Sequence, residues 1–268
     1  MKLTNRKFST LKTYGLAILL FGCTLFLSVL LNKGIIKQYF PFTAIILLTI
    51  VTWFLYKREQ QSLNSIGLNL KLKNLALLPL GLLIGSIAFL IAKYLRALYL
   101  DETFNVSLEI NYNNILYALY AILPTVAVEE FLFRGYLFKK TIEISSVTRA
   151  NIIFSILFML IHVLDENVLK NPGAIILLTI SIPVGHLLFA TALLKSKSLF
   201  LPIGIHLGNN WATRHLVTTN NDGESIFYVT NNVGFNTWSS FILFVLLWNS
   251  FFLLVTYVIW KWNSKKSF

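Results

Sequence analysis

Apolar residues fill eight stretches of the chain, and polar residues gather in the short segments between them. These stretches lie at about 12–32, 39–56, 74–95, 113–138, 148–164, 174–194, 198–216 and 238–260. At roughly 1.5 Å per residue, an apolar helix of about 20 residues crosses the hydrocarbon core of a bilayer. The pattern therefore predicts an all-α fold, a polytopic bundle of about eight transmembrane helices.

Composition supports a membrane location. Of 268 residues, 56% are hydrophobic and 13% are charged, whereas charged residues make up about 25% of a typical soluble domain. The single cysteine, Cys23, excludes an intrachain disulfide framework and a multi-cysteine metal site. The apolar run continues to Leu31, which favours an uncleaved first span over a lipoprotein signal segment.

The net charge of +12 is distributed as a topology signal rather than as a nucleic-acid surface. Sixteen of the 23 lysines and arginines fall in the terminal segments, including Lys265 and Lys266, and in every second loop. Six fall in the alternate loops, and Arg134 lies within a span. This bias predicts that both termini are cytoplasmic, with the lipid bilayer as a partner and no nucleic acid.

The order of spans and loops divides the chain into three parts. Residues 1–112 hold three spans, 113–216 hold four, and 217–268 hold an external loop and the last span. The segment 57–73 is predicted to be a cytoplasmic loop on the membrane surface. The segment 217–237, rich in Asn, Thr and Gly, is predicted to be a mobile external connection.

Three charged residues lie in the fourth apolar stretch, where burial costs at least about 2.5–3.5 kcal/mol each and usually marks function. Glu130 and Arg134 are four residues apart, so they share a helix face and are predicted to pair. Glu129 is rotated by about 100° from that face. Without a cation of its own, Glu129 is left to accept a proton near neutral pH, as a general base does.

Two more pairs have the same helical spacing: Phe158 with His162, and His206 with Asn210. Counting residues from the cytoplasmic ends places Glu129, His162 and His206 within reach of one interior cavity. His186 and His215 have no polar partner in a comparable pattern, and packing roles are predicted for both.

These residues form three motifs in order, E-E-x-x-x-R, F-x-x-x-H and H-x-x-x-N. Together they resemble the intramembrane CAAX-protease and bacteriocin-processing family, over about 113–216. Phe131-Leu132-Phe133-Arg134-Gly135 and the segment 197–202 before His206 are similar to it as well.

The resemblance implies a hydrolase in which Glu129 activates water with help from His162. It implies that His206 and Asn210 stabilise the oxyanion, and that Glu130 and Arg134 organise the site. No cofactor is favoured. Zinc held by Glu129, His162 and His206 is the alternative, although the chain lacks the H-E-x-x-H pattern of many zinc proteases.

The leading hypothesis is an endopeptidase of the bacterial cytoplasmic membrane that cleaves a membrane-associated peptide or protein. The alternative is a non-catalytic member of the same family, acting as an immunity factor or as a regulator of an envelope enzyme or sensor. The intact motifs favour the enzyme. An ion-coupled transporter ranks third, because no inverted repeat of broken helices is visible.

Overall fold

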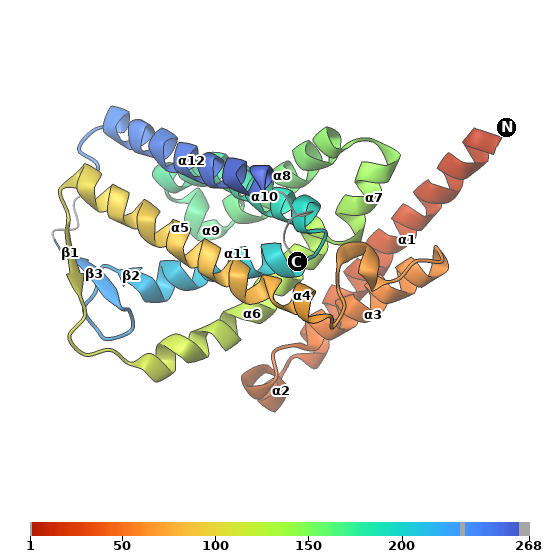
Figure 1. Ribbon diagram of the computed structural model, residues 1–268, viewed down its shortest axis with the longest axis horizontal. Helices are drawn as coiled ribbons and strands as arrows, with labels where there is room; N and C mark the ends of the chain where they lie inside the picture. The colour runs from red at the N-terminus through yellow and green to blue at the C-terminus, as the bar shows by residue number, and fades with distance from the viewer. Residues whose placement is uncertain (1, 231–233, 263–268) are drawn as a thin grey trace.

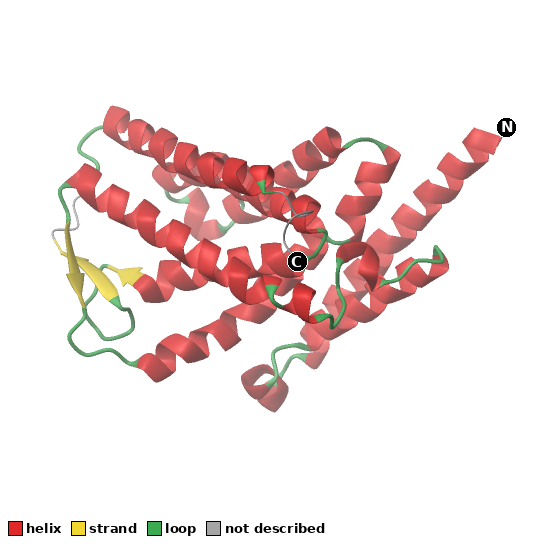
Figure 2. Ribbon diagram, in the orientation of Figure 1, coloured by secondary structure: helices red, strands yellow, loops and turns green. Residues whose placement is uncertain are grey.

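The computed structural model describes residues 2–230 and 234–262, and the side chains from Leu11 onward. The helices form one bundle, with a small sheet at one end (Figures 1 and 2). The prediction of a cytoplasmic C-terminus rests partly on Lys265 and Lys266. These two residues lie outside the described residues.

The helical elements follow the eight predicted apolar stretches. The first half contains α1 (Lys2–Leu31), α2 (Gly34–Tyr39), α3 (Thr43–Arg58), the 3-10 helix η1 (Leu63–Ile66), α4 (Leu72–Leu75) and α5 (Leu77–Leu100). The second half contains α6 (Tyr112–Arg134), α7 (Tyr136–Ile144), α8 (Val147–Val163), α9 (Glu166–Leu169), α10 (Pro172–Ser196), α11 (Phe200–Trp211), the π-helix η2 (Ala212–Leu216) and α12 (Trp238–Lys261).

Five helical segments in the described part of the chain are long and apolar enough to cross a membrane, as expected of a multi-pass membrane protein. They are Leu11–Leu31, Leu72–Leu100, Tyr112–Ile144, Pro172–Ser196 and Trp238–Lys261. The other predicted spans contain α3, α8 and α11, which have 16, 17 and 12 residues. Helix length thus supports five crossings and leaves the count of eight as a prediction.

The sheet was not predicted. Its strands are β1 (Thr103–Val106), β2 (Val217–Thr218) and β3 (Phe227–Thr230), in the order β1-β3-β2. β1 runs antiparallel to β3, and β2 runs parallel to it. The predicted mobile connection 217–237 therefore contains two strands, because its backbone pairs with a segment more than 100 residues away in the sequence.

The predicted loop 57–73 also contains structure, since η1 lies within it and α4 begins at its end. The hydroxyl of Ser62 caps η1 by accepting from the backbone amide of Asn64. A left-handed Gly67 (φ 67°) ends it. The chain turns there against the backbone at Ser198, where a Cβ on Gly67 would not fit.

α11 lies at the centre of the bundle, and its residues 201–208 are all buried. α5 packs along it through glycines on both helices, which allow the two backbones to approach closely. A Cβ on Gly85 would overlap the Ile205 carbonyl and lie 2.9 Å from the Asn209 amide nitrogen. A Cβ on Gly208 would overlap the Leu82 carbonyl. α5 and α11 run in the same direction toward the sheet (Figure 1).

α6 ends at Arg134, Gly135 separates the two helices, and α7 begins at Tyr136. A Cβ on Gly135 would overlap the carbonyl of Phe131, so a side chain does not fit at this break. The predicted fourth span, 113–138, therefore consists of two helices rather than one. The break places the charged end of α6 inside the bundle, against α11.

Candidate active site

The charged residues of α6 divide as the helical spacing predicts. Arg134 Nη1 donates to Glu130 Oε1 at 3.0 Å, and both side chains are fully buried. Glu129 does not contact this arginine within hydrogen-bonding distance, and its side chain is 21% exposed. Its Oε2 is buried and accepts no hydrogen bond from the described residues.

The buried guanidinium of Arg134 lies over aromatic rings as well as beside a carboxylate. Its Cζ is 4.1 Å from the ring centroid of Phe158 on α8 and 5.0 Å from that of Phe189 on α10. Cation–π attraction of this kind reaches about 2 kcal/mol when the cation is removed from water. Phe158 thus helps to stabilise the buried guanidinium of Arg134.

His206 connects the two glutamates. Its Nδ1 lies 2.8 Å from Glu130 Oε1, and its Nε2 lies 3.7 Å from Glu129 Oε2. A carboxylate can only accept, so Nδ1 carries a proton and donates it to Glu130. His206 can therefore donate from Nε2 only as an imidazolium.

The plane of the His206 ring is held by aromatic residues from two other helices. The Phe189 ring stacks on it, with centroids 4.6 Å apart and an interplanar angle of 15°. The Phe158 ring meets it edge-on at 6.2 Å. Stacking and the hydrogen bond to Glu130 together leave the imidazole little freedom to turn.

His162 is oriented by the backbone of its own helix. Its Nδ1 donates to the Phe158 carbonyl at 2.8 Å, and the Phe158 ring packs edge-on against the imidazole at 4.6 Å. The F-x-x-x-H spacing thus provides both the acceptor and the aromatic contact. Nε2 is left as the nitrogen free to interact with water or substrate.

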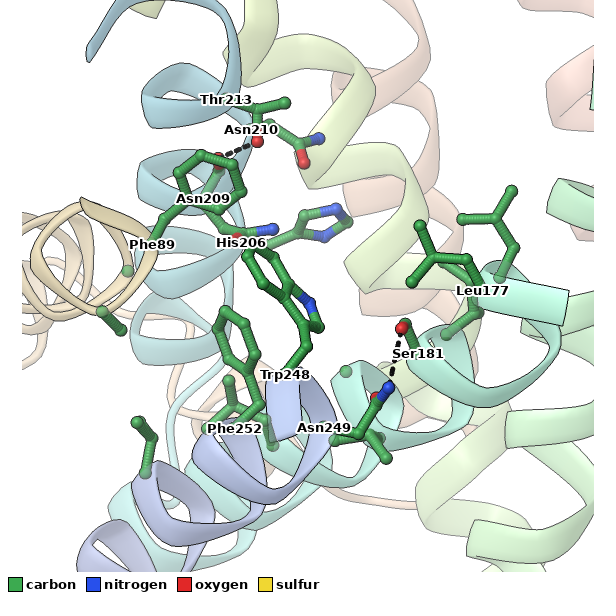
Figure 3. A pocket seen from close by; sticks show the side chains of 18 of the residues that line it. Phe89, Leu177, Ser181, His206, Asn209, Asn210, Thr213, Trp248, Asn249 and Phe252 are labelled. Carbon is green, nitrogen blue, oxygen red and sulfur yellow. Dashed lines mark hydrogen bonds between the residues drawn. The ribbon is translucent and has the colours of Figure 1, made fainter. Parts of the chain in front are cut away.

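A cavity of about 480 Å³ lies between α5, α8, α10, α11 and α12, and its wall is mainly aromatic and aliphatic. His162, His206 and Asn210 line it, and Figure 3 shows the last two. Glu129, Glu130 and Arg134 are not among its lining residues. The expectation that Glu129 and the histidines share one cavity wall therefore holds only for the histidines, and Glu129 is connected to the cavity through His206.

Several polar residues of the cavity were not singled out from the sequence. Asn249 on α12 donates to the Ser181 hydroxyl on α10 at 3.1 Å, as Figure 3 shows. Asn209 and Lys93 also line the cavity. In the sequence these positions stand out only as isolated polar residues in apolar helices. None of them belongs to a motif that would have marked it as a candidate site residue.

The remaining histidines do not line the cavity. His186 is fully buried against the ring of Phe138, at 5.7 Å, and neither ring nitrogen has a hydrogen-bond partner among the described residues. His215 Nδ1 donates to the Glu224 carbonyl at 3.0 Å and so ties η2 to the segment before β3. Both arrangements are packing or structural contacts, in line with the roles predicted for these residues.

The positions of the candidate ligands bear on the zinc alternative. Within residues 2–230 and 234–262, no three His, Cys, Asp or Glu side chains converge as metal ligands. Nδ1 of His162 and Nδ1 of His206 each contact a protein acceptor, so only Nε2 of each ring is left to bind a metal, as in many metal sites. The candidate ligands Glu129, His162 and His206 do not converge on one metal position as they are arranged.

In the comparison with known families, residues 111–212 match the family described as type II CAAX prenyl endopeptidase Rce1-like. The match spans α6 to α11 and contains all three motifs. Neither the curated proteins nor the solved structures give a match. The resemblance expected from the motifs is confirmed, and this part of the chain is an Rce1-like domain of that protease family.

Proposed function

We propose that this chain, whose residues 111–212 form an Rce1-like domain, is an intramembrane endopeptidase that hydrolyses a peptide bond by glutamate-activated water. One observation carries the proposal. The His206 imidazole is fixed between Glu130 and Glu129. It also lines a cavity, together with His162 and Asn210. A structural ion pair alone would not need this additional set of polar groups.

In the proposed reaction, Glu129 takes a proton from a water molecule, and the resulting hydroxide attacks the carbonyl carbon of the scissile bond. Its Oε2 supports this role, because it accepts no hydrogen bond from the described residues and lies 3.7 Å from Nε2 of His206, which lines the cavity. His162 Nε2 would help to orient the water. Glu129 then returns the proton to the amine that leaves when the carbon–nitrogen bond breaks.

The negative charge of the tetrahedral intermediate would be stabilised by His206 and Asn210. Nε2 of the His206 imidazolium and the side-chain amide of Asn210 would donate to the oxyanion. Loss of a single donor of this kind costs about 2.7–4 kcal/mol in a well-studied protease. Glu130 and Arg134 would act as positioning residues, because Glu130 holds Nδ1 of the imidazole.

The cavity supports an apolar peptide substrate. Its wall consists mainly of apolar side chains with a few polar groups, which is the usual composition of a site for a largely apolar ligand. We propose that residues 113–216 form the catalytic core, between the N-terminal helices 1–112 and the C-terminal part 217–268. The substrate would be a membrane-associated peptide or protein.

The proposal is tested by Glu129→Gln, with Glu166→Gln as the matched control, since Glu166 is exposed and outside the cavity. Membrane peptides from cells with each variant are compared by mass spectrometry. Cleavage products should be lost in Glu129→Gln alone, while both variants insert equally. Unchanged products in Glu129→Gln, together with an unchanged cellular phenotype, would instead identify a non-catalytic regulator or immunity factor.

We further propose that the protein lies in the cytoplasmic membrane with both termini inside. The distribution of lysines and arginines supports this orientation, which puts the sheet end of the bundle outside. In a Cys23→Ser background, a cysteine at Asn220 should react with an impermeant maleimide in intact cells. A cysteine at Asn69 should react only after permeabilisation, and the reverse pattern would refute the orientation.

A further inference from the structure

The C-terminal ends of α10 and α12 form a cationic surface outside the cavity. The ammonium groups of Lys195 on α10 and Lys261 on α12 lie over the same indole ring, that of Trp260. Their Nζ atoms are 5.4 and 4.9 Å from its centroid, so the two charges are at most about 10 Å apart. A single anion at this ring would attract both ammonium groups.

The protein supplies no counter-ion for these two lysines. Neither has a carboxylate within ion-pair distance in residues 2–230 and 234–262. In the sequence, Glu59 and Glu143 are the only acidic residues of the segments that the proposed topology places inside. Both contact Lys140, at 2.7 and 3.0 Å. The charge of Lys195 and Lys261 is therefore left for a partner from outside the described chain.

This surface lies where the headgroups of a bilayer would be. α10 and α12 are two of the five segments long and apolar enough to cross a membrane, and each lysine lies in the last turn of its helix. Trp260 and Tyr257 are more than half exposed, as aromatic residues at a membrane–water interface are. One and two turns before the end of α12, Val258 and Leu254 expose aliphatic side chains. A surface that is cationic at its end and aliphatic below it matches a phospholipid molecule.

We propose that Lys195, Lys261 and Trp260 bind the phosphodiester headgroup of an anionic phospholipid, whose acyl chain lies along the exposed face of α12. Both ammonium groups donate to the phosphate oxygens. A zwitterionic lipid binds more weakly, because its own ammonium group adds a third positive charge. Basic surfaces between membrane helices commonly bind anionic headgroups in this way. The bound lipid joins α10 to α12, and both helices line the cavity.

The test measures lipid binding by the full chain. The protein is purified in detergent and titrated with phosphatidylglycerol or phosphatidylcholine, and native mass spectrometry counts the bound lipid. Phosphatidylglycerol should bind more tightly than phosphatidylcholine. Lys195→Met combined with Lys261→Met should weaken the binding of phosphatidylglycerol by about 25-fold, because each lysine near an anionic headgroup contributes about fivefold.

The matched control is Lys71→Met combined with Lys73→Met. It removes the same charge from two exposed lysines of the segment 57–73 and should leave binding unchanged. Lys195→Arg combined with Lys261→Arg keeps both charges and should retain the preference for phosphatidylglycerol. Lysines in the last turn also stabilise a helix through its dipole, whichever lipid is present. Only a loss that is specific to phosphatidylglycerol therefore supports the site.

Equal binding of the two lipids would overturn the proposal, as would an equal loss in the control variant. Displacement of the lipid by an equal concentration of inorganic phosphate would overturn it too, since that result indicates a site for a free anion without contact to the acyl chain. These outcomes are independent of the proposed endopeptidase, because no cleavage is measured.

Discussion

Glu129 and Glu130 are adjacent on α6, and the same substitution should cost far more stability at Glu130 than at Glu129. Glu130 Oε1 accepts from Arg134 at 3.0 Å and from His206 at 2.8 Å, and the Glu130 and Arg134 side chains are fully buried. Glu130→Gln keeps the size of the side chain but removes the charge that compensates a buried guanidinium. Removing one partner of a buried ion pair costs about 3–5 kcal/mol.

Glu129→Gln should cost less than about 1 kcal/mol, the usual range for a loosely paired and partly exposed charge. Its nearest charged contact is His206 Nε2 at 3.7 Å, and its side chain is 21% exposed. Both variants should lose proteolytic activity. Only Glu130→Gln should also lose several kcal/mol of the free energy of unfolding.

The measurement is equilibrium unfolding in mixed micelles titrated with SDS, followed by tryptophan fluorescence. A double variant, Glu130→Gln with Arg134→Met, removes the uncompensated guanidinium and should recover part of the loss. Equal destabilisation by Glu129→Gln and Glu130→Gln would refute the division of roles. So would a Glu130→Gln variant within about 1 kcal/mol of the unsubstituted protein.

Three further results are expected. Gly85→Ala should destabilise the protein by about 1–3 kcal/mol, because its Cβ meets the backbone at Asn209. Gly15→Ala, with open space around the Cβ, should not destabilise it. The same unfolding assay compares the two variants. Phe189→Leu removes the ring stacked on His206. The lost stacking energy of about 0.5–1.5 kcal/mol should lower kcat by up to about tenfold at an unchanged KM. A change confined to KM would contradict this prediction. Dialysis against a chelator should leave turnover unchanged, and restoration of lost activity by added zinc would refute the metal-free mechanism.

Much of the helical framework can be predicted from the sequence, since the length of an apolar run and its polar boundaries are local properties. The ion pair between Glu130 and Arg134 is confirmed for the same reason, because helical spacing alone brings residues four apart onto one face. The sheet could not be predicted in this way. Thr103 pairs with Thr230, and no local pattern in either segment specifies that partner.

The sequence by itself determined that the chain is apolar enough for a membrane, that Glu130 pairs with Arg134, and that three motifs mark the Rce1-like domain. Only the tertiary structure decided what surrounds His206. Its contacts with Glu130, Glu129 and Phe189 join α11 to α6 and α10, and contacts between helices depend on packing rather than on spacing within one helix. The same packing placed Lys93 beside the cavity and kept Glu129 out of its wall.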